Sequence, residues 1–260
     1  MTTSLAELLT EATSRSVEGW DFSWLGERIS TRPMDWSFDS IVDERSQHAP
    51  NLLDMGTGGG EWLAALRHRP ARTVATEGWP PNVVVAARRL RPLGVPVVWS
   101  EDAPDNVDQR RGELCGRLPF RAGSFALVVN RHASFAAAEV NRVLSAGGAF
   151  LTQQMGSDYR DAYDALGLDH PKRGREWNVA LASEQLADAG LRIAEAQEGT
   201  SITEFADIGA FAWYLRAVPW AIPGFKIEAH HSALERLHEQ LTRGGVLTIQ
   251  QSAFFLAATK

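Results

Sequence analysis

The stretch LLDMGTGGGEWLAAL, from Leu52 to Leu66, decides the fold of this chain. Two leucines lead to an acidic residue, four glycines follow within five residues, and apolar residues at helical spacing come next. A short apolar run that stops at glycine is typical of a buried strand, and the spacing after it predicts a helix. In open α/β sheets, ligands bind beyond the carboxyl ends of the strands. The stretch therefore predicts a ligand-binding bend.

Strands and helices alternate from about residue 50 onward. The predicted strands are 51–56, 71–78, 95–101, 124–130, 148–155, 191–199 and 252–260, and the predicted helices are 60–69, 80–94, 134–148 and 182–190. Such alternation indicates an α/β fold with a mostly parallel sheet and helices on both faces. We expect an N-terminal helical lid at 1–49, a ligand-binding core at 50–199, a helical insertion at 200–248 and a last core strand at 249–260.

The composition narrows the class of protein. The net charge of −6 argues mildly against nucleic acid as a partner, because phosphate binding favours a basic surface. Cys115 is the only cysteine, so an intrachain disulfide is excluded, and we expect an ordinary packed thiol. The N-terminus lacks the pattern of a secretory signal, and no apolar run approaches the length of a membrane span. We expect a cytoplasmic monomer or homodimer with neither nucleic acid nor membrane as partner.

The glycines at the bend suit a ligand other than a dinucleotide. Gly56, Gly58 and Gly60 permit positive φ and a close approach of the backbone to a ligand. The dinucleotide fingerprint G-x-G-x-x-G needs a third glycine where this chain has Glu61. A carboxylate there would lie at the helix end that phosphates need. The bend therefore predicts a ligand without a pyrophosphate.

Polar and aromatic residues follow the next two strands. Glu77 ends the second strand, where its carboxylate can accept both hydroxyls of a ribose, although a solvated loop acid is the alternative. Trp79 offers an aromatic face beside an adenosine. Asp102 follows the third strand, where it can bind an adenine amine or cap a helix. Together these residues predict an adenosine site without a phosphate subsite.

Five motifs follow one another in order along the chain: LLDMGTGGGE, VATEG, SEDA, LPFRAGSFALVVNRH and EVNRVLSAGGAFLTQQ. With these motifs in this order, the chain resembles the class I S-adenosylmethionine-dependent methyltransferases, in particular those similar to methyltransferase type 11. The resemblance covers about residues 45–155. It implies a Rossmann-like, seven-stranded sheet with an antiparallel last strand, and S-adenosyl-L-methionine as the cofactor. The stretches GWDFSW and DIGAFAWYLRAVPWAIPGF are similar to a bacterial branch of the family whose members often act on small molecules.

The resemblance also implies which residues hold the cofactor. The bend would bind its methionine and ribose, and Asp54 would orient its amino group through water or the loop backbone. Asn130 and Arg131, at the tip of the fourth strand, are expected to contact the methionine carboxylate or the acceptor. The expected cofactor-binding residues are Asp54, Gly56, Thr57, Gly58, Gly60, Glu77, Gly78, Trp79, Asp102, Ala103, Asn130 and Arg131.

His132 is the candidate catalytic residue. It follows the fourth strand, where the family places substrate-facing residues, and its titration range suits proton transfer near neutral pH. A general base is needed only when the acceptor loses a proton, and a structural histidine bonded to backbone is the alternative. No metal is expected, because His230, His231 and His238 lack the spacing of metal-binding helices.

Aromatic residues mark the two regions outside the sheet. We expect residues 1–49 and 200–248 to build the acceptor pocket, because the sheet uses its own polar groups for the cofactor. The expected acceptor-binding residues are Trp20, Phe22, Trp24 and Trp213. The alternative is that the helix around Trp213 packs its aromatic side chains into a core.

The predicted function is transfer of a methyl group from S-adenosylmethionine to a small-molecule acceptor at an oxygen, nitrogen or carbon atom. The NPPY-type signature of base methylation is absent, since the fourth strand reads VVNRHA. The alternatives are an RNA or protein methyltransferase and an enzyme of the same fold that cyclises or cleaves the cofactor. A nicotinamide oxidoreductase and a non-catalytic binding module also stay open.

Overall fold

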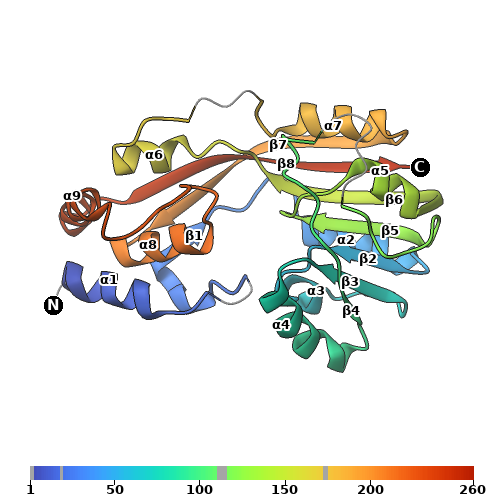
Figure 1. Ribbon diagram of the computed structural model, residues 1–260, viewed down its shortest axis with the longest axis horizontal. Coiled ribbons are helices and arrows are strands. Elements are labelled where there is room, and N and C mark those ends of the chain that lie inside the picture. The colour runs from blue at the N-terminus through green and yellow to red at the C-terminus, as the bar shows by residue number, and fades with distance from the viewer. Residues whose placement is uncertain (1–2, 18–19, 110–115, 172–174) are drawn as a thin grey trace.

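The computed structural model describes residues 3–17, 20–109, 116–171 and 175–260, and Cys115 lies outside them. Its centre is an eight-stranded sheet in the order β1-β7-β8-β6-β5-β2-β3-β4 (Figure 1). The strands are β1 (Ile29–Thr31), β2 (Leu52–Met55), β3 (Thr73–Glu77), β4 (Val97–Trp99), β5 (Phe125–Arg131), β6 (Leu144–Met155), β7 (Arg192–Phe205) and β8 (Leu247–Thr259).

The direction of the strands follows the predicted fold. Strands β4, β3, β2, β5 and β6 pair in parallel, and β8 runs antiparallel to both β6 and β7. The prediction of a mostly parallel sheet with an antiparallel last strand is therefore confirmed. Strand β1, which was not predicted, adds an eighth strand by pairing antiparallel with the edge of β7.

Each face of the sheet carries its own apolar cluster. On one face lie α5 (Ala137–Val143) and α7 (Val179–Asp188), and on the other lie α2 (Phe38–His48), α3 (Glu61–Ala65) and α4 (Pro80–Leu90). In β8, Phe254 and Leu256 belong to the first cluster, whereas Phe255 and Ala257 belong to the second. Because successive strand side chains point to opposite faces, an apolar run such as β8 fills both layers. We call this part of the molecule the core lobe.

Strands β7 and β8 continue beyond the core lobe and carry a second lobe (Figure 1). Its elements are α1 (Leu5–Ser14), the 3-10 helix η1 (Ser23–Arg28), β1, α6 (Arg160–Leu166), α8 (Ile208–Ala217), α9 (His231–Thr242) and the outer residues 200–205 and 247–252 of the two long strands. The guanidinium of Arg28 donates to both carboxylate oxygens of Asp207, at 2.6 and 2.9 Å, and to Glu11 at 2.8 Å. This ion-pair group joins α1, η1 and the start of α8.

The packing differs from the expected division of the chain in three places. Residues 200–205 continue β7, because alternate side chains such as Ser201 and Phe205 are buried there. Helix α2 lies within 1–49 but packs on the core sheet. The helix expected over 134–148 ends at Val143, because Leu144 already pairs with β5 and the next residues form a bulge in β6. Within the part of the chain that the structure describes, no helix has both the length and the apolar character to cross a membrane.

Candidate active site

The glycine bend lies between β2 and α3. Gly58 adopts a φ of 62°, and its N–H donates to Glu77 Oε2 at 2.7 Å. A Cβ atom on Gly58 would lie 2.5 Å from Cδ1 of Trp20, so the bend needs glycine both for its conformation and for this close approach. The third fingerprint position, Glu61, pairs with Arg89, which also donates to the carbonyl of Gly59.

Glu77 lies at the end of β3, and its carboxylate fixes the backbone of the bend by hydrogen bonds. One carboxylate oxygen accepts from the N–H of Gly58 at 2.7 Å, and the other accepts from the N–H of Trp79 at 2.9 Å. Burial raises the pKa of Glu77, the backbone hydrogen bonds oppose that rise, and the charge of Asp102 adds to it. Each oxygen keeps further acceptor capacity. The carboxylate can therefore also accept a pair of ribose hydroxyls.

Asp54, the last-but-one residue of β2, is a buried carboxyl group with little support from the protein. Its relative exposure is 2%, and burial raises its pKa to about 7. Thr57 lowers that pKa, the charge of Glu77 raises it, and Arg131 lowers it. A cationic ligand beside Asp54 would favour the ionised carboxylate.

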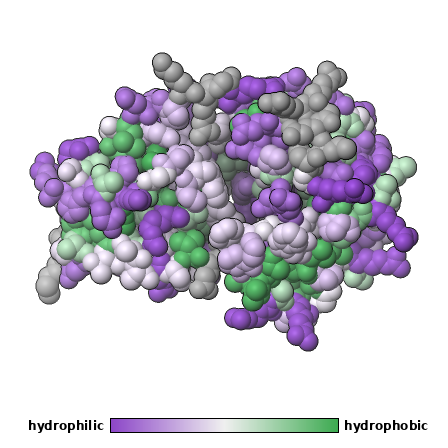
Figure 2. All heavy atoms as spheres, viewed as in Figure 1, coloured by the Kyte–Doolittle hydropathy of each residue, from purple (hydrophilic) through white to green (hydrophobic). Residues whose placement is uncertain are grey.

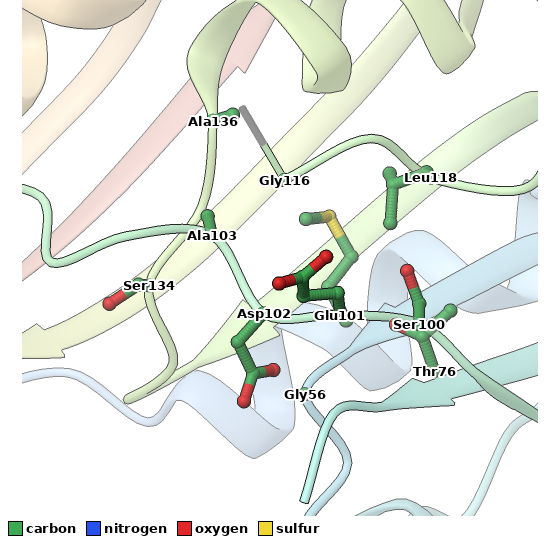
Figure 3. Close-up of a pocket in the computed structure, with 11 residues that line it drawn as sticks. Gly56, Thr76, Ser100, Glu101, Asp102, Ala103, Gly116, Leu118, Ser134 and Ala136 are labelled. Carbon is green, nitrogen blue, oxygen red and sulfur yellow. The ribbon is translucent and has the colours of Figure 1, made fainter. Parts of the chain in front are cut away.

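A small, open pocket lies beside the bend, between the loops that follow β4 and β5 (Figure 3). Its lining residues are Met55, Gly56, Thr76, Ser100, Glu101, Asp102, Ala103, Gly116, Leu118, Ser134 and Ala136. The side chain of Asp102 rests against Gly78 so closely that a Cβ atom on that glycine would collide with it. Sequence reasoning found Gly56, Asp102 and Ala103 but missed the others. Ser100 and Glu101 directly precede Asp102, which is a signal that could have found them, whereas Ser134 and Ala136 gave none.

Three buried polar atoms in this region have no hydrogen bond of normal length among the described residues: Asp54 Oδ2, Thr57 Oγ1 and Ser100 Oγ. Thr57 is nevertheless close enough to Asp54 to lower its pKa, so Ser100 is the least supported of the three. Buried polar atoms are nearly always paired in folded proteins, so these atoms point to a polar ligand. With Glu77 and Asp102 nearby, the ligand that fits has hydroxyl groups, an amine and positive charge. S-adenosylmethionine, with its ribose, its amino group and its sulfonium, has all three.

The structure separates the two residues predicted at the tip of β5. Asn130 is fully buried and donates to the carbonyl of Met55 at 3.1 Å. Its oxygen accepts from Thr152 at 3.0 Å and from Gln154 at 2.6 Å. The Asn130 side chain thus joins β2, β5 and β6 beneath the site. Arg131 is exposed instead; the protein atoms around it lower its pKa, and the charges of Asp39 and Asp54 oppose that change.

His132 follows directly and has an unusual backbone. Its φ of 61° makes it the one described non-glycine residue in the left-handed region. Its N–H donates to the carbonyl of Gln153 at 2.9 Å, and its Nε2 lies 3.3 Å from Nε2 of Gln153. The side chain is open to solvent, yet the protein atoms around it desolvate it, which lowers its pKa, and the charge of Arg131 lowers the pKa further. The imidazole is therefore neutral near pH 7.

Aromatic side chains of the second lobe reach the glycine bend. Trp20 stacks on Phe22 with 5.7 Å between ring centroids, and it meets the edge of Trp220 at 5.6 Å. The indole N–H of Trp220 donates to the hydroxyl of Tyr159 at 2.9 Å. Trp20 and Trp220 are 40% and 49% exposed. Figure 2 shows the surface hollowed between the two lobes.

The other two residues expected in the acceptor pocket lie deeper in the second lobe. Trp213 is 2% exposed and packs edge-on against Phe22 and Trp24. The ring of Trp24 is covered by the guanidinium groups of Arg15 and Arg28, at 5.0 and 5.3 Å. Trp24 and Trp213 therefore form the wall behind Phe22. Trp220, which was absent from the expected set, takes the exposed position.

The histidines considered for a metal lie in the second lobe. His230 Nδ1 lies 2.8 Å from the carbonyl oxygen of Lys226, at the start of α9. Across the described ranges, no group of three or more His, Cys, Asp or Glu side chains is arranged to hold a metal ion.

Residues 53–152 match the family model of a methyltransferase domain. Among solved structures, a candidate methyltransferase of Bacillus halodurans C-125 is similar, with 19% identity, a TM-score of 0.57, and coverage of 86% of this chain and 99% of that chain. The YcgJ protein of Bacillus subtilis is similar with 16% identity, a TM-score of 0.55, and coverage of 85% and 97%. At these identities the likeness shows a shared fold. No curated protein matches the chain in sequence.

Proposed function

We propose that this protein is an S-adenosylmethionine-dependent methyltransferase that methylates a small-molecule acceptor held in the hollow between its two lobes; the match of residues 53–152 to the model of a methyltransferase domain and the order of the strands support this. The contact between Trp20 and Gly58 carries this proposal. It brings an aromatic side chain of the second lobe onto the loop that holds the cofactor. An acceptor bound by the second lobe would meet the methyl donor at that junction.

The cofactor supplies a methyl group that is already activated on a sulfonium, so the residues of this chain mainly bind and orient. Glu77 accepts the ribose hydroxyls, and the pocket beside Asp102 takes the adenine. Asp54 and Thr57, whose buried oxygens have no hydrogen bond of normal length among the described residues, face the amino group. Arg131, the exposed cation at the same strand tips, would bind the carboxylate of the methionine part or of the acceptor. Asn130 contributes by holding the three strand tips in place.

The acceptor would lie against Trp20 and Trp220, with Phe22 behind them. Indole faces bind flat or apolar molecules well, because they combine a large contact area with a rigid ring. Trp24 and Trp213 support this wall from within the second lobe. His132, at the strand tip next to the bend, is the polar group that would touch the acceptor.

The charge around the pocket favours a small molecule over RNA. Glu101 and Asp102 line the pocket, and Asp105 and Asp108 follow on the same loop, whereas the exposed cations beside it in the described chain are Arg117 and Arg131. Basic residues gather instead where helices lead back into strands, at the opposite edge of the sheet: Arg45, Arg67, Arg72, Arg88 and Arg91. A polyanionic acceptor requires a basic surface beside the site.

Isothermal titration calorimetry tests the cofactor half of the proposal. S-adenosylmethionine and S-adenosylhomocysteine should both bind, and Glu77→Ala should weaken them by about 2–3 kcal/mol, because charge-assisted hydrogen bonds to the ribose are lost. Glu195→Ala, on the exposed face of β7, is the matched control and should bind normally. Binding of NAD without binding of S-adenosylmethionine would replace the proposal with an oxidoreductase.

A screen with labelled cofactor tests the acceptor half. Methyl-labelled S-adenosylmethionine is incubated with a small-molecule library, with RNA and with a protein extract, and mass spectrometry locates the label. Label on a small molecule supports the proposal, and label found only on RNA or protein contradicts it. Loss of the cofactor in the absence of any acceptor would indicate an enzyme that cyclises or cleaves it.

A further inference from the structure

The backbone of His132 is held in a strained conformation at the edge of the site. A left-handed φ is costly for a side chain with a Cβ atom, and such residues gather where function depends on a fixed geometry. The strand partner supplies the restraint, because the His132 N–H donates to the carbonyl of Gln153 in β6. The position of the imidazole is thereby tied to Gln153 through the backbone.

A second tie runs through the side chains. The indole N–H of Trp36 donates to Oε1 of Gln153 at 2.9 Å. An indole N–H can only donate, so the oxygen of the Gln153 amide must face Trp36 and its nitrogen must face His132. Trp36 is itself fixed: it is 8% exposed and lies so close to Gly199 in β7 that a Cβ atom there would be 3.0 Å from its ring.

The orientation of the amide decides the state of the imidazole. The Gln153 Nε2 group has only hydrogens to offer, so the Nε2 of His132, 3.3 Å away, must accept. A neutral imidazole that accepts at Nε2 carries its hydrogen on Nδ1. None of the described residues accepts a hydrogen bond from that Nδ1. The free polar group of His132 is therefore a donor.

We propose that Trp36 and Gln153 are positioning residues that hold His132 as a hydrogen-bond donor, through Nδ1–H, to an oxygen of the methyl acceptor. This role differs from the general base expected from the sequence, because the chain uses the basic nitrogen of the ring for Gln153. Arg131, the neighbouring exposed cation, favours an anionic oxygen such as a carboxylate or a phenolate. The identification of the hydrogen-bonded ligand as a methyl acceptor rests on the proposed function. The tautomer of the His132 ring does not, because it is a property of the free protein.

The ring is tested first, in the protein without ligands. Nitrogen-15 NMR of histidine-labelled protein reports which ring nitrogen carries the hydrogen, and His132→Gln identifies the signal. Wild type should show the Nδ1–H form. Gln153→Glu replaces the donating amide with an accepting carboxylate and should shift the ring to the Nε2–H form. Trp36→Phe frees the amide to turn and should give a mixture of both forms.

Gln47→Glu, on the exposed surface of α2, is the matched control and should leave the signal unchanged. The inference is overturned if wild type shows the Nε2–H form, or if Gln153→Glu keeps the Nδ1–H form while the amide spectrum shows an intact fold.

The donor role is tested with a probe, benzoate, added to protein saturated with S-adenosylhomocysteine. Benzoate should shift the His132 signal in a saturable way and bind at least fivefold better than benzylamine, its cationic counterpart. His132→Asn keeps an N–H near the position of Nδ1 and should retain binding, whereas His132→Ala should lose most of it. Equal binding of the two probes, or equal loss in the two variants, contradicts the donor role. Absence of S-adenosylhomocysteine binding would instead contradict the proposed function and leave the NMR result standing.

Discussion

The two lobes share β7 and β8 but offer different groups to a ligand. In the core lobe the strand tips carry polar side chains: Asn130 bonds to Thr152, Gln154 and the backbone of β2, while Asp54 and Ser100 keep oxygens without a partner among the described residues. In the second lobe the surface towards the bend is aromatic, with Trp20 and Trp220 half exposed and Trp213 packed behind Phe22. Hydrogen-bonded networks fix a geometry, whereas apolar packing sets mainly shape and volume. The core lobe therefore suits binding of the cofactor, and the second lobe suits selection of the acceptor.

The shared strands also imply that the two lobes unfold together. β7 and β8 pair over their whole length, from the core lobe into the second lobe, with one irregularity near Ile193. A domain boundary normally falls where few contacts cross. Here the pairing of β7 with β8 runs through it without a break, from Gly199 and Ala253 to Thr200 and Ser252. The difference between the lobes is thus one of chemistry within one cooperative unit.

The largest expected effect is on the free energy of unfolding, and it tests whether the two lobes unfold as one unit. Phe211→Ala in the second lobe and Phe150→Ala in the core lobe each empty a site that is 0% exposed, so each should lower the free energy of unfolding by about 3–5 kcal/mol. Differential scanning calorimetry should show one transition in wild type and in both variants. Leu93→Ala, at an exposed position, is the control. Two separate transitions would make the lobes independent.

Gly58→Val tests the point where the lobes touch. Its side chain would collide with Trp20 and strain a positive φ, so cofactor affinity should fall by at least about a hundredfold, or ~2.7 kcal/mol. Gly123→Val is the matched control, because Gly123 also has a positive φ, of 69°, but has open space around it. The control should lose stability and keep its affinity in calorimetric titration. Equal loss of affinity in both variants would assign the effect to strain alone.

Asp54→Asn tests the buried carboxyl group of the core lobe through pH. The folded protein holds the Asp54 proton more tightly than the unfolded chain, since its pKa is about 7 instead of near 4. Stability from this group is therefore greatest below pH 4 and is lost as the pH rises to 7. The gain in unfolding free energy from Asp54→Asn should be about 2 kcal/mol larger at pH 8 than at pH 5, measured by urea denaturation. A difference that does not vary with pH would place the Asp54 pKa near its usual value.

The smallest expected effect concerns the exposed wall of the second lobe. Trp220→Ala should raise the acceptor KM about fivefold, or ~1 kcal/mol, because one face of the wall is lost. Cofactor affinity and melting temperature should stay near wild type, since the side chain is half exposed. Val246→Ala, an exposed apolar position elsewhere in the same lobe, should change none of these values. A fall in melting temperature without a change in KM would give Trp220 a purely structural role.

The parts of the fold that could be read from the sequence are those set by neighbours along the chain. The bend at Gly58 and the strand that ends at Glu77 depend on residues within a few positions, and the structure has both where they were predicted. The length of β7 was missed, because residues 200–205 gain their strand pairing from β8 and β1. Strand β1 itself has only three residues and exists through that pairing.

The candidate site shows the same limit. Asn130 was expected to face a ligand, but its partners Thr152 and Gln154 lie more than twenty residues away and bury it. Trp213 and Trp220 look alike in sequence, and only the packing of Phe22 and Trp24 shows which one is covered. The link from Trp36 to Gln153 spans 117 positions, so no local pattern could signal it.

The short strands at the two edges of the sheet have a consequence for how the chain behaves at high concentration. β1 and β4 contain three residues each, and they close the sheet on either side. A long edge strand offers a row of unpaired N–H and C=O groups on which another chain can add a strand, and this is a common start of aggregation. Strands β6 and β8 lie inside the sheet, whereas β7 pairs with β1 only at residues 203–205. The outer edge of β7 before Thr203 is therefore a long sheet edge, and the charged residues Arg192, Glu195 and Glu198 along it oppose the addition of a strand from another chain.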